Sequence, residues 1–303
     1  MRLFSRVFLA LANRDRLHWM SDRPYLRRFW RAVMGYPLDL DRPTTYNEKL
    51  QWLKLYDRTP YYPDLVDKII AKERAGEILG QDAIIPTLGV WERAEDVNFD
   101  SLPDRFVLKC THDSGTVIVC NDKTKLDRKA AIEKLSQGLS RNYYYRTREW
   151  YYKDIQPRVL AEAYLSDERN EDGELSDYKF YCFDGTPVFV MVCVGRKKGK
   201  PSFFYFDRDW NALPYDRITK DAPTNEIPKR PQNLEQLFEA AEKLSKGLSH
   251  VRVDLYSVGD RIYFGEWTLC SGGGYDLDIT PEADRYFGSL LKLPQSNKQR
   301  ESQ

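Results

Sequence analysis

The sequence predicts an α+β protein in which strands and helices follow one another along most of the chain. Apolar stretches typical of strands recur from residue 106 onward, and helical patterns of apolar residues lie between them. With 303 residues, of which 42% are hydrophobic, the chain can form one large domain or two closely packed ones. The expected strands cover 106–110, 116–120, 158–165, 178–183, 187–194 and 202–207, with a hairpin over 251–269 and helices at 66–79, 128–139 and 234–248.

Residues 1–64 are expected to form a helical extension ahead of these elements. Arginine-rich helical patterns alternate there with breaks that contain proline. Thr45 and Glu48 have the spacing of a capping box, in which the two side chains satisfy the first backbone N–H groups of a helix. After the extension, the helix at 66–79 is expected to lead into a short strand at 83–86 and then into loops.

The charge of the chain is balanced, with 47 Lys and Arg residues against 46 Asp and Glu residues. This balance argues against nucleic acid as a partner of the whole chain. The local exception is 1–31, where eight arginines stand against two acids among aromatic and aliphatic residues. We consider two interpretations of this segment. It contacts an anionic membrane or an acidic glycan, or it is an amphipathic extension that packs on the main body.

The cysteines and histidines favour a cytoplasmic protein without a zinc site. The run from Val7 to Ala12 is too short for the core of a secretion signal, which needs about 7–15 apolar residues. No later run reaches the roughly 18 apolar residues of a membrane span. The three histidines are scattered. Five cysteines, an odd number, lie in strand-like stretches without metal-ligand spacing, so we expect reduced core thiols at Cys110, Cys120, Cys182, Cys193 and Cys270.

The hairpin at 251–269 carries the main candidate for a metal site. A loop of three residues, Gly259 to Arg261, would place Asp254 opposite Glu266. Opposed residues lie about 4.5–5.5 Å apart at Cβ, so the two carboxylates would repel each other without a bridging cation. Magnesium accepts one or two carboxylates and completes its shell with water and phosphates. A loop of two residues would put the carboxylates on opposite faces, and a surface hairpin with solvated acids is the alternative.

Three consecutive glycines, Gly272, Gly273 and Gly274, follow the hairpin directly. Such a run permits close approach of the backbone to a ligand, and successive amides can then point at an anion. A flexible loop is the other interpretation. The chain contains no Walker lysine motif and no G-x-G-x-x-G sequence, so the common phosphate loops are excluded.

Two lysines interrupt apolar strands, Lys109 and Lys179. A buried lysine is costly unless it meets an anion, and a polyphosphate would be such an anion. The alternative for each is a lysine that faces solvent from a half-buried strand.

Together these pieces resemble the ATP-grasp superfamily in their order along the chain. More narrowly they resemble its TupA-like branch, which is named for teichuronopeptide biosynthesis and associated with bacterial capsule and surface-polysaccharide clusters. Residues 42–57 resemble the N-terminal signature of that branch, and the resemblance covers roughly residues 40–290. It is carried by Asp67-Lys68, 85–91, 102–115, Glu162, 177–180, 252–254 and 266–268.

The resemblance implies an ATP-grasp fold, with two α+β lobes around an ATP cleft and an N-terminal helical extension. The implied divisions are the Arg-rich extension 1–64, a pre-ATP-grasp segment 65–105, a small lobe 106–160, a large lobe with the metal hairpin 161–294, and a loose tail 295–303.

The resemblance also implies roles for individual residues. Lys68 and Lys109 would contact the phosphates of ATP, and Lys179 the terminal phosphate. Arg252 would lie near an acyl phosphate. The remaining implied contacts are Ser114 and Gly115 in the loop after Lys109, Glu162, Ala163 and Leu165 at the adenine hinge, Asp254, Glu266 and Thr268 at magnesium, and Gly272, Gly273 and Gly274 at the substrate.

Two positions depart from the family pattern. Thr268 stands where many ATP-grasp enzymes place a metal-binding Asn, and the loop after Lys109 contains only one glycine, Gly115.

The implied function is an ATP- and Mg2+-dependent ligase that joins a carboxylate to an amine through an acyl phosphate and releases ADP. The expected partners are a sugar or glycan that bears a carboxylate, such as a uronic acid, and an amino acid or amino alcohol. Neutralising Asp254 or Glu266 is expected to suppress turnover and leave the fold intact. The alternatives are a glycosyltransferase that uses the Asp276-Leu277-Asp278 pair, and a scaffold without catalysis that binds a glycan or a membrane.

Overall fold

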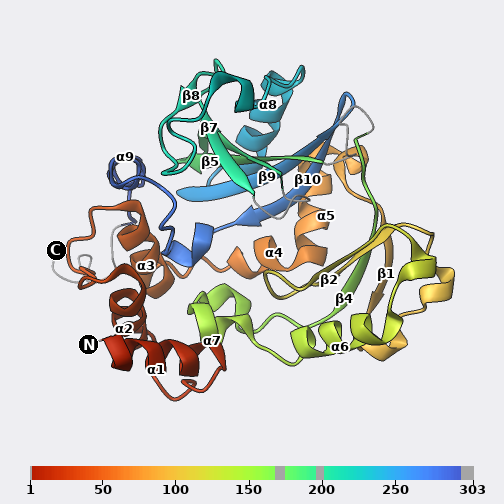
Figure 1. The fold of residues 1–303 in the computed structure, drawn as a ribbon, viewed down its shortest axis with the longest axis horizontal. Coiled ribbons are helices and arrows are strands. Elements are labelled where there is room, and N and C mark those ends of the chain that lie inside the picture. Colours follow the sequence, from red (N-terminus) through yellow and green to blue (C-terminus); the bar gives the residue numbers. More distant parts are fainter. Residues whose placement is uncertain (1, 168–174, 196–200, 295–303) are drawn as a thin grey trace.

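The computed structural model describes residues 2–167, 175–195 and 201–294, and the expected tail at 295–303 lies outside this part. It shows two antiparallel sheets with helices packed on them (Figure 1). The helices are α1 (Arg2–Asn13), α2 (Asp22–Met34), α3 (Tyr46–Tyr56), α4 (Tyr62–Val66), α5 (Lys68–Leu79), α6 (Arg128–Leu139), α7 (Tyr143–Thr147), α8 (Leu234–Ser245) and α9 (Pro281–Leu290). The strands are β1 (Thr87–Trp91), β2 (Phe106–Cys110), β3 (Val117–Cys120), β4 (Val159–Ala163), β5 (Ser176–Phe183), β6 (Thr186–Val194), β7 (Ser202–Phe206), β8 (Ala212–Leu213), β9 (His250–Val258) and β10 (Arg261–Thr268).

The smaller sheet has four strands in the order β1-β4-β2-β3. Burial alternates along β2, because successive side chains of a strand point to opposite faces. One face packs against α6 and contributes Phe106, Leu108 and Val159 to a core with Leu135 of that helix. The other face carries Lys109 and Glu162 toward the interior of the molecule.

The larger sheet has six strands in the order β10-β9-β5-β6-β7-β8. Helix α8 covers one of its faces (Figure 1), where Phe180 of β5 meets Phe238 of α8 with ring centroids 4.9 Å apart. Val253 and Leu255 of β9 complete this core. Because the apolar face is covered, the polar side chains of the same strands lie on the opposite face, which looks toward the smaller sheet.

The N-terminal extension packs on the main body through α2 and α3. Tyr25, Leu26 and Trp30 of α2 are fully buried. The expected capping box is confirmed, since the Thr45 side chain accepts from the Glu48 N–H and the Glu48 side chain accepts from the Thr45 N–H. The packed interpretation of the extension therefore holds for α2 and α3.

A buried arginine after α7 joins the extension to the body. The guanidinium of Arg148 lies over the ring of Tyr25, 4.2 Å from its centroid. It donates to the Leu17 carbonyl at 2.7 Å and lies 3.3 Å from the Asp22 carboxylate. A cation–π contact is stronger when the cation is desolvated, as it is here.

The segment before the small sheet differs from its prediction. The expected helix 66–79 is present as α5, which begins at Lys68 because Asp67 caps its start and accepts from the Ile69 N–H. The expected strand at 83–86 is wrong, since a 3-10 turn there leads into β1. This strand occupies the stretch around Gly89 that was predicted as loop. Gly89 marks a register shift between β1 and β4, which hides the alternation of a regular strand.

Thr45→Ala should lower the free energy of unfolding by about 1 kcal/mol, because it removes the acceptor for the first turn of α3. Denaturant unfolding measures this loss. Ser289→Ala, which removes an exposed hydroxyl at the end of α9, is the control and should leave stability unchanged. Equal losses in the two variants would contradict a capping role.

Candidate active site

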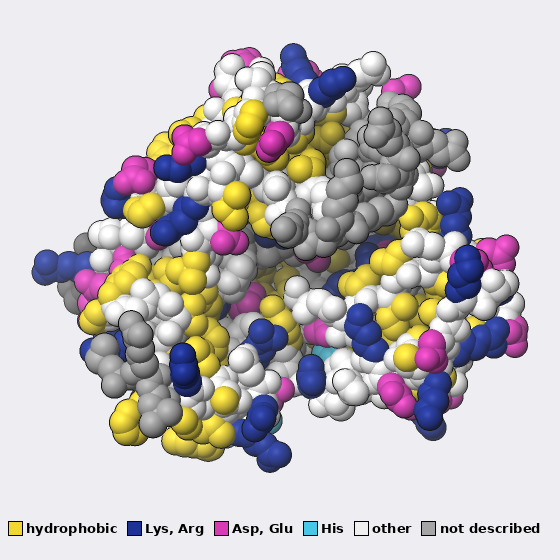
Figure 2. Space-filling model, viewed as in Figure 1, with side chains coloured by type: hydrophobic (Ala, Val, Ile, Leu, Met, Phe, Trp, Pro, Cys, Tyr) yellow, Lys and Arg dark blue, Asp and Glu magenta, His cyan; other side chains and the backbone are white. Residues whose placement is uncertain are grey.

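A cavity of about 980 Å3 lies between the two sheets. Figure 2 shows this side of the molecule hollowed between the part that holds the larger sheet and the part that holds the smaller one. Its walls are the polar faces of both sheets, so strands far apart in the sequence face each other across it. Among the sequence-predicted site residues, those that line it are Lys68, Lys109, Ser114, Gly115, Glu162, Ala163, Leu165, Lys179, Arg252, Asp254, Glu266 and Gly272.

On the wall of the smaller sheet, Glu162 stands between two lysines. Its Oε1 is 2.7 Å from the Nζ of Lys72, and its Oε2 is 2.6 Å from the Nζ of Lys109. Burial alone would raise the pKa of Glu162, but Lys109 and Lys72 outweigh it and hold that pKa below its ordinary value. Burial lowers the pKa of Lys72, and the charge of Glu162 is the largest effect that opposes this shift. Both lysines line the cavity.

The N-terminus of α5 adds a third lysine. The Nζ of Lys68 donates to the Asp113 carbonyl, in the loop between β2 and β3. Burial lowers the pKa of Lys68, and the charge of Glu266 is the largest effect that opposes this shift. Ser114 and Gly115 of the same loop line the cavity, with Gly115 at φ +109° in a conformation that favours glycine.

On the wall of the larger sheet, Asp254 of β9 is held by two cations. Arg252 donates to both of its carboxylate oxygens, at 2.6 and 2.8 Å, and Lys179 of β5 donates to one of them. Lys179 also lies 2.8 Å from Asp177 on its own strand. Burial alone would raise the pKa of Asp254, but Arg252 and Lys179 outweigh it and hold that pKa below its ordinary value.

The pairing of the metal hairpin is as expected, but the turn is not. β9 and β10 are joined by two residues, since Val258 pairs with Arg261, so the expected loop of three residues is wrong. A bulge between Phe264 and Glu266 shifts the register by one, and Glu266 then pairs with Asp254. A side chain at Gly265 would lie 2.9 Å from the Asp254 carbonyl, which explains the glycine at the bulge.

The carboxylates of this hairpin fit a magnesium ion that also binds phosphate. The side chain of Glu266 is 45% exposed, and its Oε1 lies 3.6 Å from Arg252 and 3.4 Å from the Thr268 hydroxyl. It is thus free to turn into the cavity. Thr268 also accepts from Arg252 at 3.0 Å. The described ranges contain no group of three or more acidic, His or Cys side chains that could hold a metal ion, so the shell of a magnesium ion here would need phosphate and water.

Only the first glycine of the run 272–274 lines the cavity. All three have positive φ, between 58° and 71°. The carbonyl of Gly273 accepts from Lys54 at 2.6 Å and from Gln51 at 3.1 Å, and the carbonyl of Gly274 accepts from Gln51 at 2.7 Å. Gly273 and Gly274 therefore face α3 behind the cavity wall, and Gly272 faces the cavity.

The part of the cavity beyond Arg252 has aromatic and acidic walls. The carboxylates there accept hydrogen bonds from hydroxyl or ammonium donors. One oxygen of Asp276 already accepts the amides of Asp278 and Ile279, so the Asp276-Leu277-Asp278 segment is a turn at the cavity edge. These walls are formed by Tyr181, Phe203, Tyr205, Tyr275, Asp216, Asp276 and Asp278.

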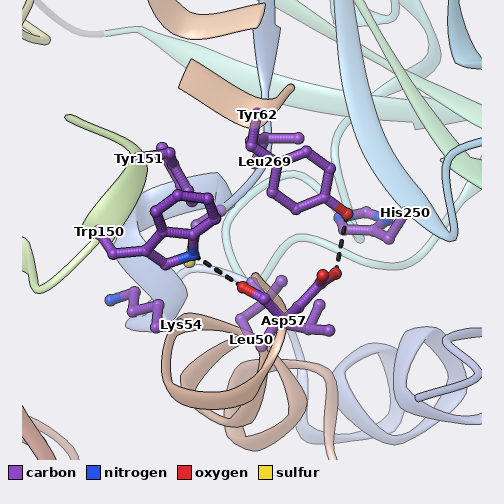
Figure 3. A pocket seen from close by; sticks show the side chains of 10 residues that line it. Leu50, Lys54, Asp57, Tyr62, Trp150, Tyr151, His250 and Leu269 are labelled. Atoms are coloured by element: carbon purple, nitrogen blue, oxygen red, sulfur yellow. Dashed lines mark hydrogen bonds between the residues drawn. The ribbon is translucent and has the colours of Figure 1, made fainter. Parts of the chain in front are cut away.

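A second, small cavity lies where α3 and α4 meet the body (Figure 3). Asp57 ends α3 there, accepting the Tyr62 hydroxyl at 2.8 Å and, through its carbonyl, the Trp150 N–H at 2.7 Å. Its volume is about 20 Å3, enough for one water molecule. This small cavity lies where the extension packs on the body, and it has no room for a substrate.

Sequence reasoning missed Lys72 and Asp177, although both carried a signal. Lys72 follows Lys68 by one helical turn, so the two point the same way from α5. Asp177 precedes Lys179 by two residues on β5 and thus shares its face. Both side chains line the large cavity.

A family model for the TupA-like ATP-grasp proteins matches residues 48–292, which is most of the chain. The chain belongs to the TupA-like ATP-grasp family. The range matched by the family model includes all the site residues that were predicted from the sequence. A search of curated protein sequences found no match.

Solved structures with a similar arrangement include other ATP-grasp proteins. D-alanine–D-alanine ligase from Bacillus anthracis, complexed with ATP, is 17% identical over 75% of this chain and 63% of its own, with a TM-score of 0.45. The ATP-grasp ligase PsnB, complexed with a precursor variant, Mg and ADP, is 12% identical over 90% and 74%, with a TM-score of 0.41. A RimK domain protein from Sphaerobacter thermophilus is 15% identical over 76% and 68%, with a TM-score of 0.40. This TupA-like chain thus spans less than two thirds of the Bacillus anthracis enzyme.

Asp254→Asn should destabilise the protein by about 3 kcal/mol, because it leaves Lys179 and Arg252 buried without their shared anion. This revises the expectation that the fold tolerates the change. Glu266→Gln, on the exposed partner, is the matched control and should cost less than about 0.5 kcal/mol. Denaturant melts of both variants test this, and equal stability would contradict the buried network.

The same network predicts a pH dependence. A depressed pKa in the folded state contributes stability above the pKa of an unfolded aspartate, about 3.9, and the contribution is lost as pH falls through the folded-state pKa. The stability difference between wild type and Asp254→Asn should therefore be constant from pH 7 to 5 and narrow below about pH 4. A difference that does not change with pH would assign the loss to packing.

Proposed function

We propose that this TupA-like protein is an ATP- and Mg2+-dependent ligase that joins a carboxylate to an amine and releases ADP. The observation that carries the proposal is the cavity between the sheets, which has cations on both walls and an opposed pair of carboxylates. Membership of an ATP-grasp family supports it. We further propose that residues 106–160 and 161–294 act as the two lobes around the nucleotide.

In this proposal the triphosphate lies across the cavity between the lysines. Lys68, Lys72 and Lys109 approach it from one side and Lys179 from the other, and each contributes charge where the phosphates are anionic. The adenine lies beside the backbone of Ala163 and Leu165, where β4 ends and the cavity wall continues. Glu162 keeps Lys72 and Lys109 oriented before the nucleotide arrives.

Asp254 and Glu266 would hold magnesium, with Thr268 supporting Glu266. When bound, the ion neutralises charge on the phosphates and helps to align them. Arg252 already contacts Asp254 and Thr268, so its guanidinium is in place beside the hairpin to bind the acceptor carboxylate. The protein residues thus supply positioning and charge, which are the main contributions of protein to phosphoryl transfer.

Two steps account for the proposed products. A carboxylate oxygen attacks the γ-phosphorus, the bond between the γ-phosphorus and the bridging oxygen breaks, and ADP leaves with that oxygen. The amine then attacks the acyl carbon of the mixed anhydride, phosphate leaves, and the amine loses a proton. Water has to be excluded between the steps, because it would hydrolyse the anhydride.

We infer that the carboxylate belongs to a uronic acid of a bacterial surface polysaccharide or its precursor, and that the amine is an amino acid or amino alcohol. The resemblance of the branch to capsule enzymes supports this inference. The far end of the cavity is also suitable, since Tyr205 and Tyr275 offer flat apolar surfaces beside carboxylates that accept from sugar hydroxyls or an ammonium group. We place the reaction in the cytoplasm, because the thiols of Cys110, Cys120, Cys182 and Cys270 are free and buried.

ATP with Mg2+ should raise the melting temperature, and Lys109→Ala should remove most of this rise by deleting a phosphate contact. Ligand at 100 times its dissociation constant stabilises a protein by about 2.7 kcal/mol. Thermal shift with ATP, UDP-sugars and Mg2+ measures the response, and the exposed Lys129→Ala on α6 is the control. If Lys109→Ala responds like Lys129→Ala, Lys109 is not a nucleotide ligand. A response to UDP-sugars alone would favour a glycosyltransferase.

Incubation with ATP, Mg2+, a panel of uronic acids and hydroxylamine should yield ADP, phosphate and a hydroxamate. Hydroxylamine traps the activated carboxylate in place of the unknown amine. AMP and pyrophosphate would instead indicate an adenylating ligase. Equal consumption of ATP without any carboxylate would refute the acyl phosphate. The variant Glu266→Gln keeps the fold, so loss of ADP formation in it separates chemistry from stability.

A further inference from the structure

Helix α1 has an exposed apolar stripe that the packing of the extension does not cover. Phe4, Val7 and Leu11 follow one another at spacings of three and four, so they lie on one face of the helix. They are 83%, 52% and 40% exposed. Trp19, in the turn between α1 and α2, is 78% exposed. Four exposed apolar side chains in one short stretch mark an interaction surface better than the same residues scattered singly would.

A neighbouring face of α1 anchors the helix to the body. Ala12 is buried, and the ring of Phe8 lies 5.7 Å from that of Tyr25 in α2. Tyr25 in turn packs under Arg148, which joins the extension to the body. Helix α1 is therefore fixed to the body, and its apolar stripe stays exposed to solvent.

The charges beside the stripe are mostly positive, with Asp15 as the one acid between α1 and Trp19. Arg6, Arg14 and Arg16 are exposed, and α1 contains no acidic residue. Yellow and dark blue side chains lie together at the lower left of Figure 2, over the region where Figure 1 shows α1. The whole chain carries a net charge of only +1, whereas residues 1–31 hold eight arginines against two acids, so positive charge is concentrated in this segment.

An apolar stripe flanked by arginines matches the boundary of a bilayer with anionic lipids, where apolar side chains enter the acyl region and arginines meet the headgroups. Tryptophan is enriched at this depth because its ring is apolar and its N–H is polar. An acidic glycan would satisfy the arginines but not Phe4, Val7 and Leu11. Among the described residues, no helix has the length and apolarity needed to cross a bilayer.

We propose that α1 and Trp19 form a peripheral docking surface for an anionic membrane. The helix lies in the plane of the interface, with Phe4, Val7 and Leu11 inserted and Arg6, Arg14 and Arg16 at the phosphates. The docking surface is separate from the nucleotide cavity. The membrane contact can therefore be tested independently of the ligase proposal.

Co-sedimentation of the full chain with vesicles tests the proposal. Wild type should bind vesicles of phosphatidylcholine with 30% phosphatidylserine at least tenfold more tightly than vesicles of phosphatidylcholine alone. Raising the salt from about 0.1 M to 1 M should weaken binding, because the Debye length falls from about 10 Å to 3 Å. Binding that ignores anionic lipid, or no binding, overturns the proposal.

Two variants separate the apolar and the charged contribution. Phe4→Ser/Val7→Ser/Leu11→Ser should bind at least tenfold more weakly, and Arg6→Glu/Arg14→Glu should lose the preference for anionic lipid. Ile78→Ser/Ile218→Ser, at exposed apolar positions elsewhere, is the matched control and should bind like wild type. Unchanged binding by either test variant, or an equal loss in the control, overturns the assignment to α1.

Two further readouts guard against misfolding and against confusion with the ligase proposal. All substituted side chains are exposed, so the melting temperature and its rise with ATP and Mg2+ should match wild type. Trp19 provides a direct probe, since the blue shift of fluorescence on vesicle binding should be present in wild type and smaller in Trp19→Phe. An equal shift in the two proteins contradicts insertion at Trp19.

Discussion

The pairing of Asp254 with Arg252 and Lys179 is the constraint on which the larger sheet depends. Asp254 and Lys179 are buried on one face and the side chain of Arg252 is only 12% exposed, and such charges are tolerated only when each meets its partner. The ion pairs bring β5 and β9 into a register in which Lys179 stands directly opposite Asp254. The opposite, apolar face of the same strands then packs against α8. One register of β5 and β9 therefore determines both the packing of the helix and the polarity of the cavity.

The smaller sheet repeats this arrangement with other residues. Glu162 lies between Lys72 and Lys109, as Asp254 lies between Arg252 and Lys179. On each wall one carboxylate holds two cations in place, and on the larger sheet Asp177 and Glu266 lie beside these cations as well. An arriving polyphosphate therefore meets groups that are already oriented, and less side-chain entropy is lost when it binds. The carboxylates are as important to this preorganisation as the lysines are.

Local patterns predicted the parts of the fold that local forces determine. The strand at Phe106–Cys110, the helix at Arg128–Leu139 and the Thr45 cap all match, because alternation, helical periodicity and capping act over a few residues. Prediction was wrong where the determinant is a contact across the fold. β1 owes its existence to β4. The length of the hairpin turn was also wrong, and Asp254 pairs with Glu266 as expected only because a bulge at Gly265 shifts the register.

The packing of α3 shows that the family boundary and the folding unit differ. The match begins at Glu48, inside that helix, whereas the helix begins with the cap at Thr45 and carries Gln51 and Lys54 against the glycine turn. At the other end of the chain, Gly288 of α9 lies so close to the backbone of Thr44 and Thr45 that a methyl group would collide with it. The family match thus delimits a segment of recognisable sequence, whereas the packing of α3 against α9 and the glycine turn also depends on residues that precede this segment.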